Sequence, residues 1–451
     1  MTTGATRDQI FEELLAAAQA RERDGEGAEI YERRGAALEV EEDDDGSRVT
    51  ESRERGFAVR LYRSGRVAFA AGGPDGAGGL LGLARAAVLR SRARRGARAA
   101  PPVPGDARSP VVPVSAPSPG DETLARELLA AFRKFVVAAG EGAVALTEGS
   151  VALGERSERV ATTAGRDVAW TSRAASLVAT VVGRSGGGRF SARVVATAAR
   201  PEELPLNRLA RHAVDRVLLP LHGRPLEVSR LDLLLDSHVA AHLVGRLAPL
   251  FFGDEAESLL LARTRDGRDP IAAPLLTLAD DASAPGGPVR TPRDGEGTPQ
   301  SRHVVVERGT PVSRLTDLAS AARRGSPSSG NAIRRSWSEP PAIGVTNFFV
   351  DPAAGVSPLD LLGGVTKGFF AALLLERPAV DVAANRFRLS VAGYGIEKGR
   401  ASGRVSEAII SGRLSDLLRR VEAVGDDLKF VAGAGGGVGS PTLLVPRWKG
   451  D

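Results

Sequence analysis

Apolar and polar residues alternate along this chain with two different periods. In residues 8–23 the apolar positions recur at three- and four-residue intervals, which predicts a helix. Further helices are expected at about 77–95, 121–140 and 201–219. The stretches between the first helices alternate apolar and polar residues and end at glycine-containing turns, which predicts antiparallel strands. The tip RSG, between FAVRLY and RVAFAA, predicts a hairpin turn.

Residues 143–199 read as four strand-like segments: AVALTEGSVALGE, RVATTAGRDVAWTSR, SLVATVVGRSG and RFSARVVATAA. The first half of the chain therefore reads as a helix followed by an antiparallel meander, used twice. This indicates an α+β fold and not a parallel βαβ arrangement. After Gly223 the pattern changes to a helix-like apolar run at 230–257, then turn-rich sequence with short β segments, a helix near 413–423 and a final strand, TLLVP.

A chain of 451 residues is too long for one ordinary core, so two or three domains are expected. Residues 100–120 hold seven prolines and cannot form a helix or a central strand. We place a linker there. The predicted organisation is an N-terminal α+β domain (1–100), a proline-rich linker (101–120), a middle α+β domain (121–222) and a β-rich C-terminal domain (223–451).

The composition narrows the class of protein without identifying it. Hydrophobic content of 42% and charged content of 25% are typical of a soluble globular protein. The net charge is only +5, so the arginine-rich composition does not indicate nucleic-acid binding. The absence of cysteine excludes disulfides, thiolate metal sites and cysteine nucleophiles. We find no apolar signal sequence and no run long enough to span a bilayer, and we expect a cytoplasmic protein.

The stretch HVAAH places His238 and His242 on one face of the predicted helix, one turn apart. Several zinc hydrolases present two of their three metal ligands in this way. Asp254 or Glu255 could supply a third ligand. This spacing keeps open the hypothesis of a metallohydrolase that uses His238 and His242.

Five segments of the C-terminal half follow the order of motifs in the TldD/PmbA family, which the chain resembles over nearly its whole length. The acidic-turn segment DGEGTPQSRHVVVERG, the loop GNAIRR and the strand segment GVTNFFVDPAAG come first. The long stretch at 386–430 contains GYGIEKG and resembles the most distinctive region of the family, and SPTLLVP fits its last strand. The resemblance implies an α+β fold with a β-rich C-terminal domain of this type.

The family has two branches, and the histidine helix separates them. The TldD branch resembles a zinc peptidase with HExxxH on a helix and a cysteine as third ligand. In this chain Val239 follows the first histidine, and matching of the flanking apolar pattern puts the expected motif near Gly245 and Arg246. The resemblance is therefore to the TldE/PmbA branch, understood as a non-catalytic subunit. It implies a TldD-like zinc peptidase as partner, with zinc in that partner and none in this chain.

Six residues are candidates for contact with a peptide substrate or for the wall of an enclosed cavity. Asp294 and Glu296 form a carboxylate pair in a Gly-Pro turn, where they could do acid–base work or hold the turn through backbone amides. We assign no catalytic residue. The other candidates, from the family-like motifs, are Asn331, Thr346, Asn347 and Glu397.

Other sequence features have simpler explanations. The glycine string GAGGGVGS lacks the spacing of a phosphate-binding loop, and the GYGIEKG segment predicts a β-turn with Lys398 and Gly399 at its tip. The arginine run RSRARRGAR is typical of a solvated helix end. His212 and His222 flank a predicted helix end, without a nucleophile motif. A stand-alone peptide-binding module, or a homodimer when the chain is alone, stays open; no nucleic-acid or membrane partner is expected.

Overall fold

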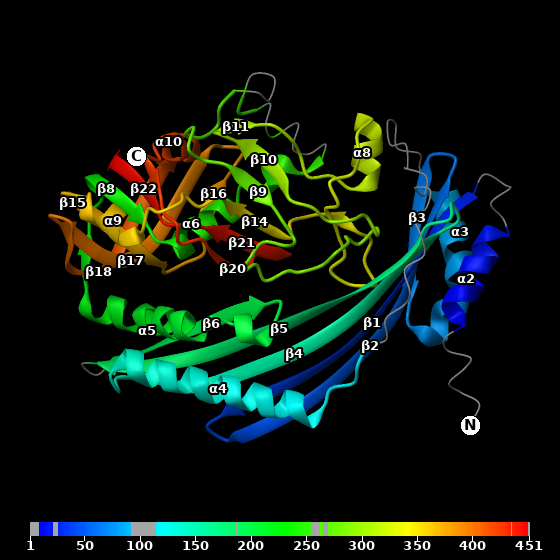
Figure 1. Ribbon diagram of the computed structural model, residues 1–451, viewed down its shortest axis with the longest axis horizontal. Helices are drawn as coiled ribbons and strands as arrows, with labels where there is room; N and C mark the ends of the chain where they lie inside the picture. Colours follow the sequence, from blue (N-terminus) through cyan, green and yellow to red (C-terminus); the bar gives the residue numbers. More distant parts are fainter. Residues whose placement is uncertain are drawn as a thin grey trace.

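The computed structural model (Figure 1) leaves part of two predicted features undescribed. Most of the arginine run and the proline-rich segment through residue 113 lie outside the described residues. Asp254 and Glu255, the candidate third ligands, also lie outside them. The described residues are 9–20, 26–91, 114–185, 188–253, 259, 262–264, 269–433 and 435–449.

Strands from both predicted N-terminal units form one antiparallel sheet in the order β3-β2-β1-β4-β5-β6. The units join where β1 pairs with β4, for example Val40 with Val151. The four segments predicted at 143–199 form three strands instead, because Arg156 and Ser172 pair with each other within strands and not in turns. The strands are β1 (Glu26–Asp43), β2 (Gly46–Arg63), β3 (Arg66–Gly72), β4 (Val144–Thr162), β5 (Asp167–Ser185) and β6 (Gly188–Ala198).

The two faces of this sheet have different neighbours, because successive side chains of a strand point to opposite faces. On one face Ile30 packs against α2 and α3, and Leu38 packs against α4 and α5. On the other face Tyr31 packs with Trp337 of the C-terminal half. Figure 1 shows α4 below the sheet and the C-terminal domain above it, with α5 at the left end of the strands between α4 and the C-terminal domain. The helices are α2 (Ile10–Gln19), α3 (Leu80–Arg90), α4 (Pro119–Gly140) and α5 (Leu206–His222), with short 3-10 turns η2 (Pro74–Gly79) and η3 (Pro201–Glu203).

The C-terminal domain contains two main sheets, which confirm the predicted α+β class with a β-rich C-terminal half. One sheet has the order β19-β22-β8-β15-β17-β18-β7, with β16 paired to β17. Its strands are β7 (Arg224–Leu226), β8 (Ser229–Leu235), β15 (Lys367–Leu374), β16 (Ala379–Asp381), β17 (Arg386–Glu397), β18 (Arg400–Arg413), β19 (Ala423–Val424) and β22 (Leu443–Lys449).

The second sheet has the order β11-β10-β9-β14-β21-β20, so β20 is an edge strand. Its strands are β9 (Leu278–Asp280), β10 (His303–Glu307), β11 (Thr310–Pro311), β14 (Asn347–Val350), β20 (Lys429–Gly433) and β21 (Gly436–Ser440). The remaining elements are the pair β12 (Ala332–Ile333) and β13 (Ala342–Ile343), the helices α8 (Leu318–Arg324), α9 (Pro358–Gly363) and α10 (Leu414–Arg419), and the 3-10 turn η4 (Ala248–Phe251).

The helix-like run at 230–257 proves to be a strand followed by a shorter helix. Four leucines of this run, at positions 231 and 233–235, belong to β8, which pairs with both β15 and β22 and is buried between them. The helix α6 (Ser237–Gly245) begins after Asp236, whose carboxylate accepts a hydrogen bond from the His238 N–H at 2.8 Å. Val239 and Leu243 of α6 then pack into the core between the two C-terminal sheets. A buried strand and a buried helix are both apolar, so the pattern did not separate them.

Two predicted hairpin tips are confirmed. Ser64 and Gly65 connect β2 to β3, and Lys398 and Gly399 connect β17 to β18, each pair with positive φ as a tight two-residue hairpin requires. The helix expected near 413–423 is shorter, at α10, because the chain enters β19 four residues after it ends. Among the described residues no helix is both long and apolar enough to cross a membrane.

Candidate functional site

Three cavities meet at the edge strand β20: two lie between the N-terminal sheet and the C-terminal domain, and the third is lined by α5 and the C-terminal domain. Their volumes are about 810, 380 and 790 Å³, and Ala432 of β20 lines all three. We name them the sheet-side cavity (Gly35, Arg156, Arg334, Thr346), the histidine cavity (His212, His238, His242) and the arginine cavity (Arg216, Arg246, Arg335, Arg377).

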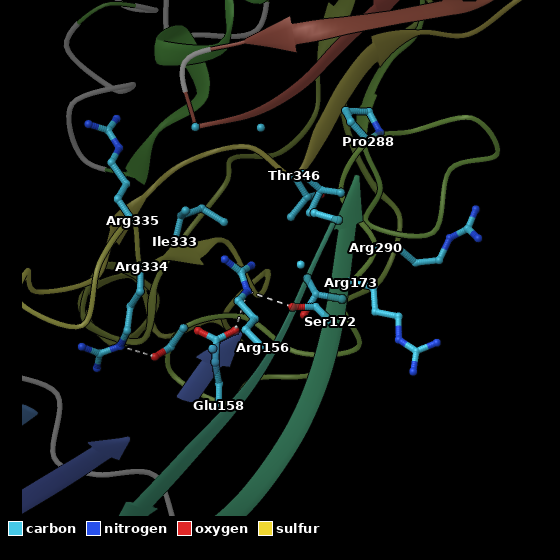
Figure 2. Close-up of a pocket in the computed structure, with 18 of the residues that line it drawn as sticks. Arg156, Glu158, Ser172, Arg173, Pro288, Arg290, Ile333, Arg334, Arg335 and Thr346 are labelled. Carbon is cyan, nitrogen blue, oxygen red and sulfur yellow. Dashed lines mark hydrogen bonds and ion pairs between the residues drawn. The ribbon is translucent and has the colours of Figure 1, made fainter. Parts of the chain in front are cut away.

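The floor of the sheet-side cavity is formed by β1, β4 and β5, and loops of the C-terminal domain close it from above. Figure 2 shows Arg156 from β4 directed toward Ser172 on β5, with the loop carrying Arg334 and Arg335 beside it. The Arg156 Nε donates to Ser172 Oγ at 2.8 Å and lies 3.4 Å from a Glu158 carboxylate oxygen. The wall is therefore rich in guanidinium groups.

Asp294 and Glu296 form a tight turn at this cavity, and both side chains are buried. Asp294 lines the cavity and accepts backbone N–H bonds from Glu296 at 2.9 Å, Thr298 at 2.8 Å and Ala332 at 3.0 Å. Burial and the nearby Glu296 carboxylate raise the pKa of Asp294 to about 7, against these backbone bonds. Asp294 therefore holds the turn through backbone amides, whereas the Glu296 carboxylate accepts a hydrogen bond from the Leu318 N–H at 2.8 Å.

Glu296 reaches into a buried ionic network that joins the two halves of the chain. Arg60 of β2 contacts Glu296 at 2.6 Å and also pairs with Glu29 of β1. Arg334 pairs with the same Glu29 and lies over the Tyr31 ring at 4.2 Å. Burial opposes ionisation of Glu29, but Arg60 and Arg334 hold its pKa below the ordinary value.

Sequence reasoning did not single out this network. Glu29 and Arg60 face each other in the β1–β2 register, and Arg334 lies in the GNAIRR motif. The register could have paired the first two residues once the hairpin was assumed. Their contact with the C-terminal half depends on tertiary structure, which local patterns do not contain.

Asn331 and Thr346 converge on a carboxylate that the sequence analysis passed over, Asp280 at the end of β9. Asp280 accepts from Asn331 Nδ2 at 2.7 Å, from Thr346 Oγ1 at 2.9 Å and from the Thr346 N–H at 2.9 Å. Burial raises the pKa of Asp280 to about 6, although these hydrogen bonds oppose the shift. Thr346 lines the sheet-side cavity, while Asn331 is buried behind it. The sequence LADD at 278–281, in which a short apolar segment ends in two acidic residues, was the feature that could have identified Asp280.

The last two candidates lie apart from each other. Asn347 is buried next to Thr346, and its amide donates to the carbonyl oxygens of Asp281 at 2.8 Å and Val289 at 2.7 Å. It therefore shapes the loop that borders the sheet-side cavity. Glu397 is exposed at the end of β17, beside the Lys398 hairpin tip. Substrate contact by any of the six candidates stays a prediction.

His238 and His242 do share one face of α6, and His212 joins them from α5. The His212 and His238 ring centroids are 4.0 Å apart, and those of His238 and His242 are 4.7 Å apart. His212 was expected at a helix end; it lies inside α5, which extends to His222. Burial, followed by nearby positive charges, lowers the pKa of His212 to about 3 and that of His242 to about 4. All three imidazoles are neutral at ordinary pH, because burial also places the pKa of His238 well below its usual value.

These residues do not fit a catalytic zinc site. Within the described part of the chain, no group of three or more His, Cys, Asp or Glu residues is placed to hold a metal ion. Val239 stands where a base would follow the first histidine, and the sequence has no cysteine to complete the set. Arg216, Arg246 and Arg377 all lower the pKa of His242, and the same positive charges would oppose a divalent cation there.

Comparison with known proteins agrees with this arrangement of elements. The sequence profile described as the PmbA/TldA metallopeptidase C-terminal domain matches residues 229–449, which include α6 and both C-terminal sheets. The chain belongs to the TldD/PmbA family. The predicted family resemblance is thereby confirmed.

Relatives carry the names of both branches. The Metalloprotease TldD homolog of Buchnera aphidicola subsp. Acyrthosiphon pisum is 28% identical over 167 residues, 37% of this chain and 34% of the relative. Metalloprotease PmbA of Escherichia coli O157:H7 is 24% identical over 214 residues, 48% of this chain and 45% of the relative. The chain thus matches about a third to a half of the length of these relatives. The crystal structure of TldE from Thermococcus kodakarensis has a TM-score of 0.81 at 18% identity, with 97% of this chain and 99% of that chain covered, which establishes the shared fold.

Proposed function

We propose that this TldD/PmbA family member is a non-catalytic, TldE-like subunit that pairs with a TldD-like zinc peptidase. The observation that carries the proposal is the composition of α6. His238 and His242 of this helix line a cavity together with Arg216, Arg246 and Arg377. Position 239 is valine, and the sequence has no cysteine. Such a site is poor for a divalent cation, so the zinc and the hydrolytic chemistry would belong to the partner.

The chain would contribute part of an enclosed space that holds unfolded peptides for degradation or processing. The edge strand β20 supports this role, because it borders all three cavities and pairs with β21 on one side. An extended peptide could add to its other edge through main-chain hydrogen bonds, which tolerate many sequences. Arg156 and Thr346 in the sheet-side cavity are then candidates for positioning that peptide.

The deciding experiment is a pull-down of the tagged full-length chain from its source cells, with the recovered chains identified and their metal counted. We expect a TldD-like chain in equal amount, one zinc ion per pair, and peptidase activity in the recovered complex. The His238→Ala, His242→Ala double variant should retain the zinc.

Two results would contradict the proposal. If the chain is recovered alone with zinc, and the double histidine variant loses both zinc and activity, it is the independent metallohydrolase. If it is recovered alone and metal-free but binds peptides, it is a stand-alone binding module. A matched variant outside the cavities, Arg63→Gln on the exposed end of β2, controls for effects of substitution on recovery.

A further inference from the structure

The arginine cavity has an unusual concentration of positive charge for a wall formed by separate elements. Arg216 comes from α5, Arg246 follows the end of α6, and Arg335 and Arg377 come from loops. Glu376 is the one acidic residue among the described residues that line this cavity, and its side chain is exposed. Four arginines and one glutamate therefore line this cavity of about 790 Å³, which gives its wall a net positive charge.

The charges of this wall also lack partners within the protein. In the described part of the chain, the side chains of Arg216, Arg246, Arg335 and Arg377 make no ion pair or hydrogen bond. Burial lowers the pKa of Arg216, and burial together with Arg377 lowers that of Arg246. This differs from the sheet-side network, where Arg60 and Arg334 are matched to carboxylates. Arg216 and Arg246 are half-buried and Arg335 and Arg377 are exposed, so an anion bound in the cavity would offset the cost of partial burial for the first two.

The shape of the surroundings indicates which anion. Ala432 and Gly433 of the edge strand β20 line both the arginine cavity and the sheet-side cavity, so a chain extended along β20 would pass from one to the other. The anions that a peptide carries are carboxylates, and a guanidinium fork matches a carboxylate through two parallel hydrogen bonds. The neutral imidazole of His242, which also lines the cavity, adds a hydrogen-bond donor without adding charge.

We propose that the arginine cavity binds a carboxylate of the peptide held along β20, either its C-terminal carboxylate or an acidic side chain. This rests on the peptide-binding part of the proposed function, and not on the zinc partner. The helix that carries two histidines would then recognise an anionic group of the substrate. Arg246 would act as a binding residue, with Arg216 and Arg377 beside it.

The test measures peptide binding to the full-length chain alone, by fluorescence anisotropy at low salt. Three labelled peptides of one neutral sequence are compared: one with a free C-terminus, one amidated, and one amidated with a single internal glutamate. We expect the free acid, the glutamate peptide or both to bind at least about tenfold more tightly than the neutral amide. Which of the two shows the gain identifies the source of the carboxylate.

Two arginine variants test whether the preference for a carboxylate arises in the arginine cavity. Arg246→Gln should reduce the preference to less than about twofold, since it removes a guanidinium fork, and Arg377→Gln should weaken it in the same direction. Both residues lack partners, so circular dichroism and thermal unfolding should show a folded chain. Arg63→Gln, on an exposed strand end away from these cavities, should keep the full preference.

Three outcomes would overturn the proposal: equal binding of all three peptides, binding of none, or a preference that survives both arginine substitutions. The pull-down tests the partnership independently. If the pull-down recovers no TldD-like partner, but Arg246→Gln abolishes the preference for a carboxylate, the proposed partnership is wrong and the proposed anion site is still supported.

Discussion

Asp280 is the residue whose burial has the clearest thermodynamic consequence. Its pKa rises from 3.8 to about 6, because the carboxyl group is removed from water among Thr346 and Asn331. Between these two pH values the folded chain holds a proton that the unfolded chain has lost. The contribution of Asp280 to the free energy of unfolding is therefore greatest below pH 4 and is lost as the pH rises through 6, by up to roughly 3 kcal/mol.

The Asp280→Asn variant isolates the contribution of Asp280 to the pH dependence of the unfolding free energy. Urea unfolding of both proteins at several pH values between 4 and 7 should show that their difference in unfolding free energy depends on pH. The wild type should lose stability relative to the variant as the pH rises. A difference that stays constant over this range would show that Asp280 titrates alike in the folded and unfolded chains.

At the scale of the elements, strand β2 packs directly against the C-terminal half at Gly56. A Cβ atom at Gly56 would lie 2.0 Å from the Trp337 ring, so this tryptophan packs directly on the strand backbone. We expect Gly56→Ala to displace the ring and to lower the free energy of unfolding by about 1–3 kcal/mol, as overpacking does. The cost should nearly vanish in a Trp337→Ala background, which denaturant unfolding of the double variant checks.

Gly73→Ala is the matched control for this prediction. Nothing lies within 4 Å of a Cβ atom at Gly73, and its φ of −69° suits alanine. Its unfolding free energy should stay within about 0.5 kcal/mol of the wild type. If Gly56→Ala were equally neutral, or equally costly without the Trp337 ring, the packing explanation would be wrong.

The elements also show where sequence patterns suffice. The turn at Ser64-Gly65 and the helix α4 follow from local chemistry, since glycine adopts positive φ readily and apolar residues at helical spacing form one buried face. The junction of β1 with β4 was not predicted, because it brings together segments separated by two strands, two helices and the proline-rich segment. The boundary between β8 and α6 was missed because both are apolar.

Sequence patterns likewise identified some residues of the candidate site and missed others. Asp294 and Thr346 were selected from motifs, and both line the sheet-side cavity. His212 and Asp280 were not, because each acquires its neighbours from a different element: His212 from α6, and Asp280 from the loop and strand that carry Asn331 and Thr346. A single sequence reveals which residues could do chemistry, but the partners that set their pKa values come from the fold.

At the scale of the whole molecule, Arg60 links the N-terminal sheet to the C-terminal domain by pairing with Glu29 and with Glu296 at 2.6 Å. All three side chains are buried, so removal of the cation leaves Glu296 without its ion-pair partner and Glu29 with Arg334 alone. We expect Arg60→Met to lower the free energy of unfolding by about 3–5 kcal/mol. Adding Glu296→Gln should recover part of this loss, because the carboxylate that lost its partner is then neutral.

Arg48→Met provides a control on the same two strands. Arg48 faces Glu41 across the β1–β2 register at 4.0 Å, but the Arg48 side chain is 78% exposed. A solvated pair of this kind contributes at most about 1 kcal/mol, so urea unfolding should barely distinguish Arg48→Met from the wild type. Similar losses for Arg60→Met and Arg48→Met would mean that the buried network does not join the two halves. A large loss for Arg60→Met alone, partly restored by Glu296→Gln, would show that the sheet and the C-terminal domain are stabilised through one shared arginine.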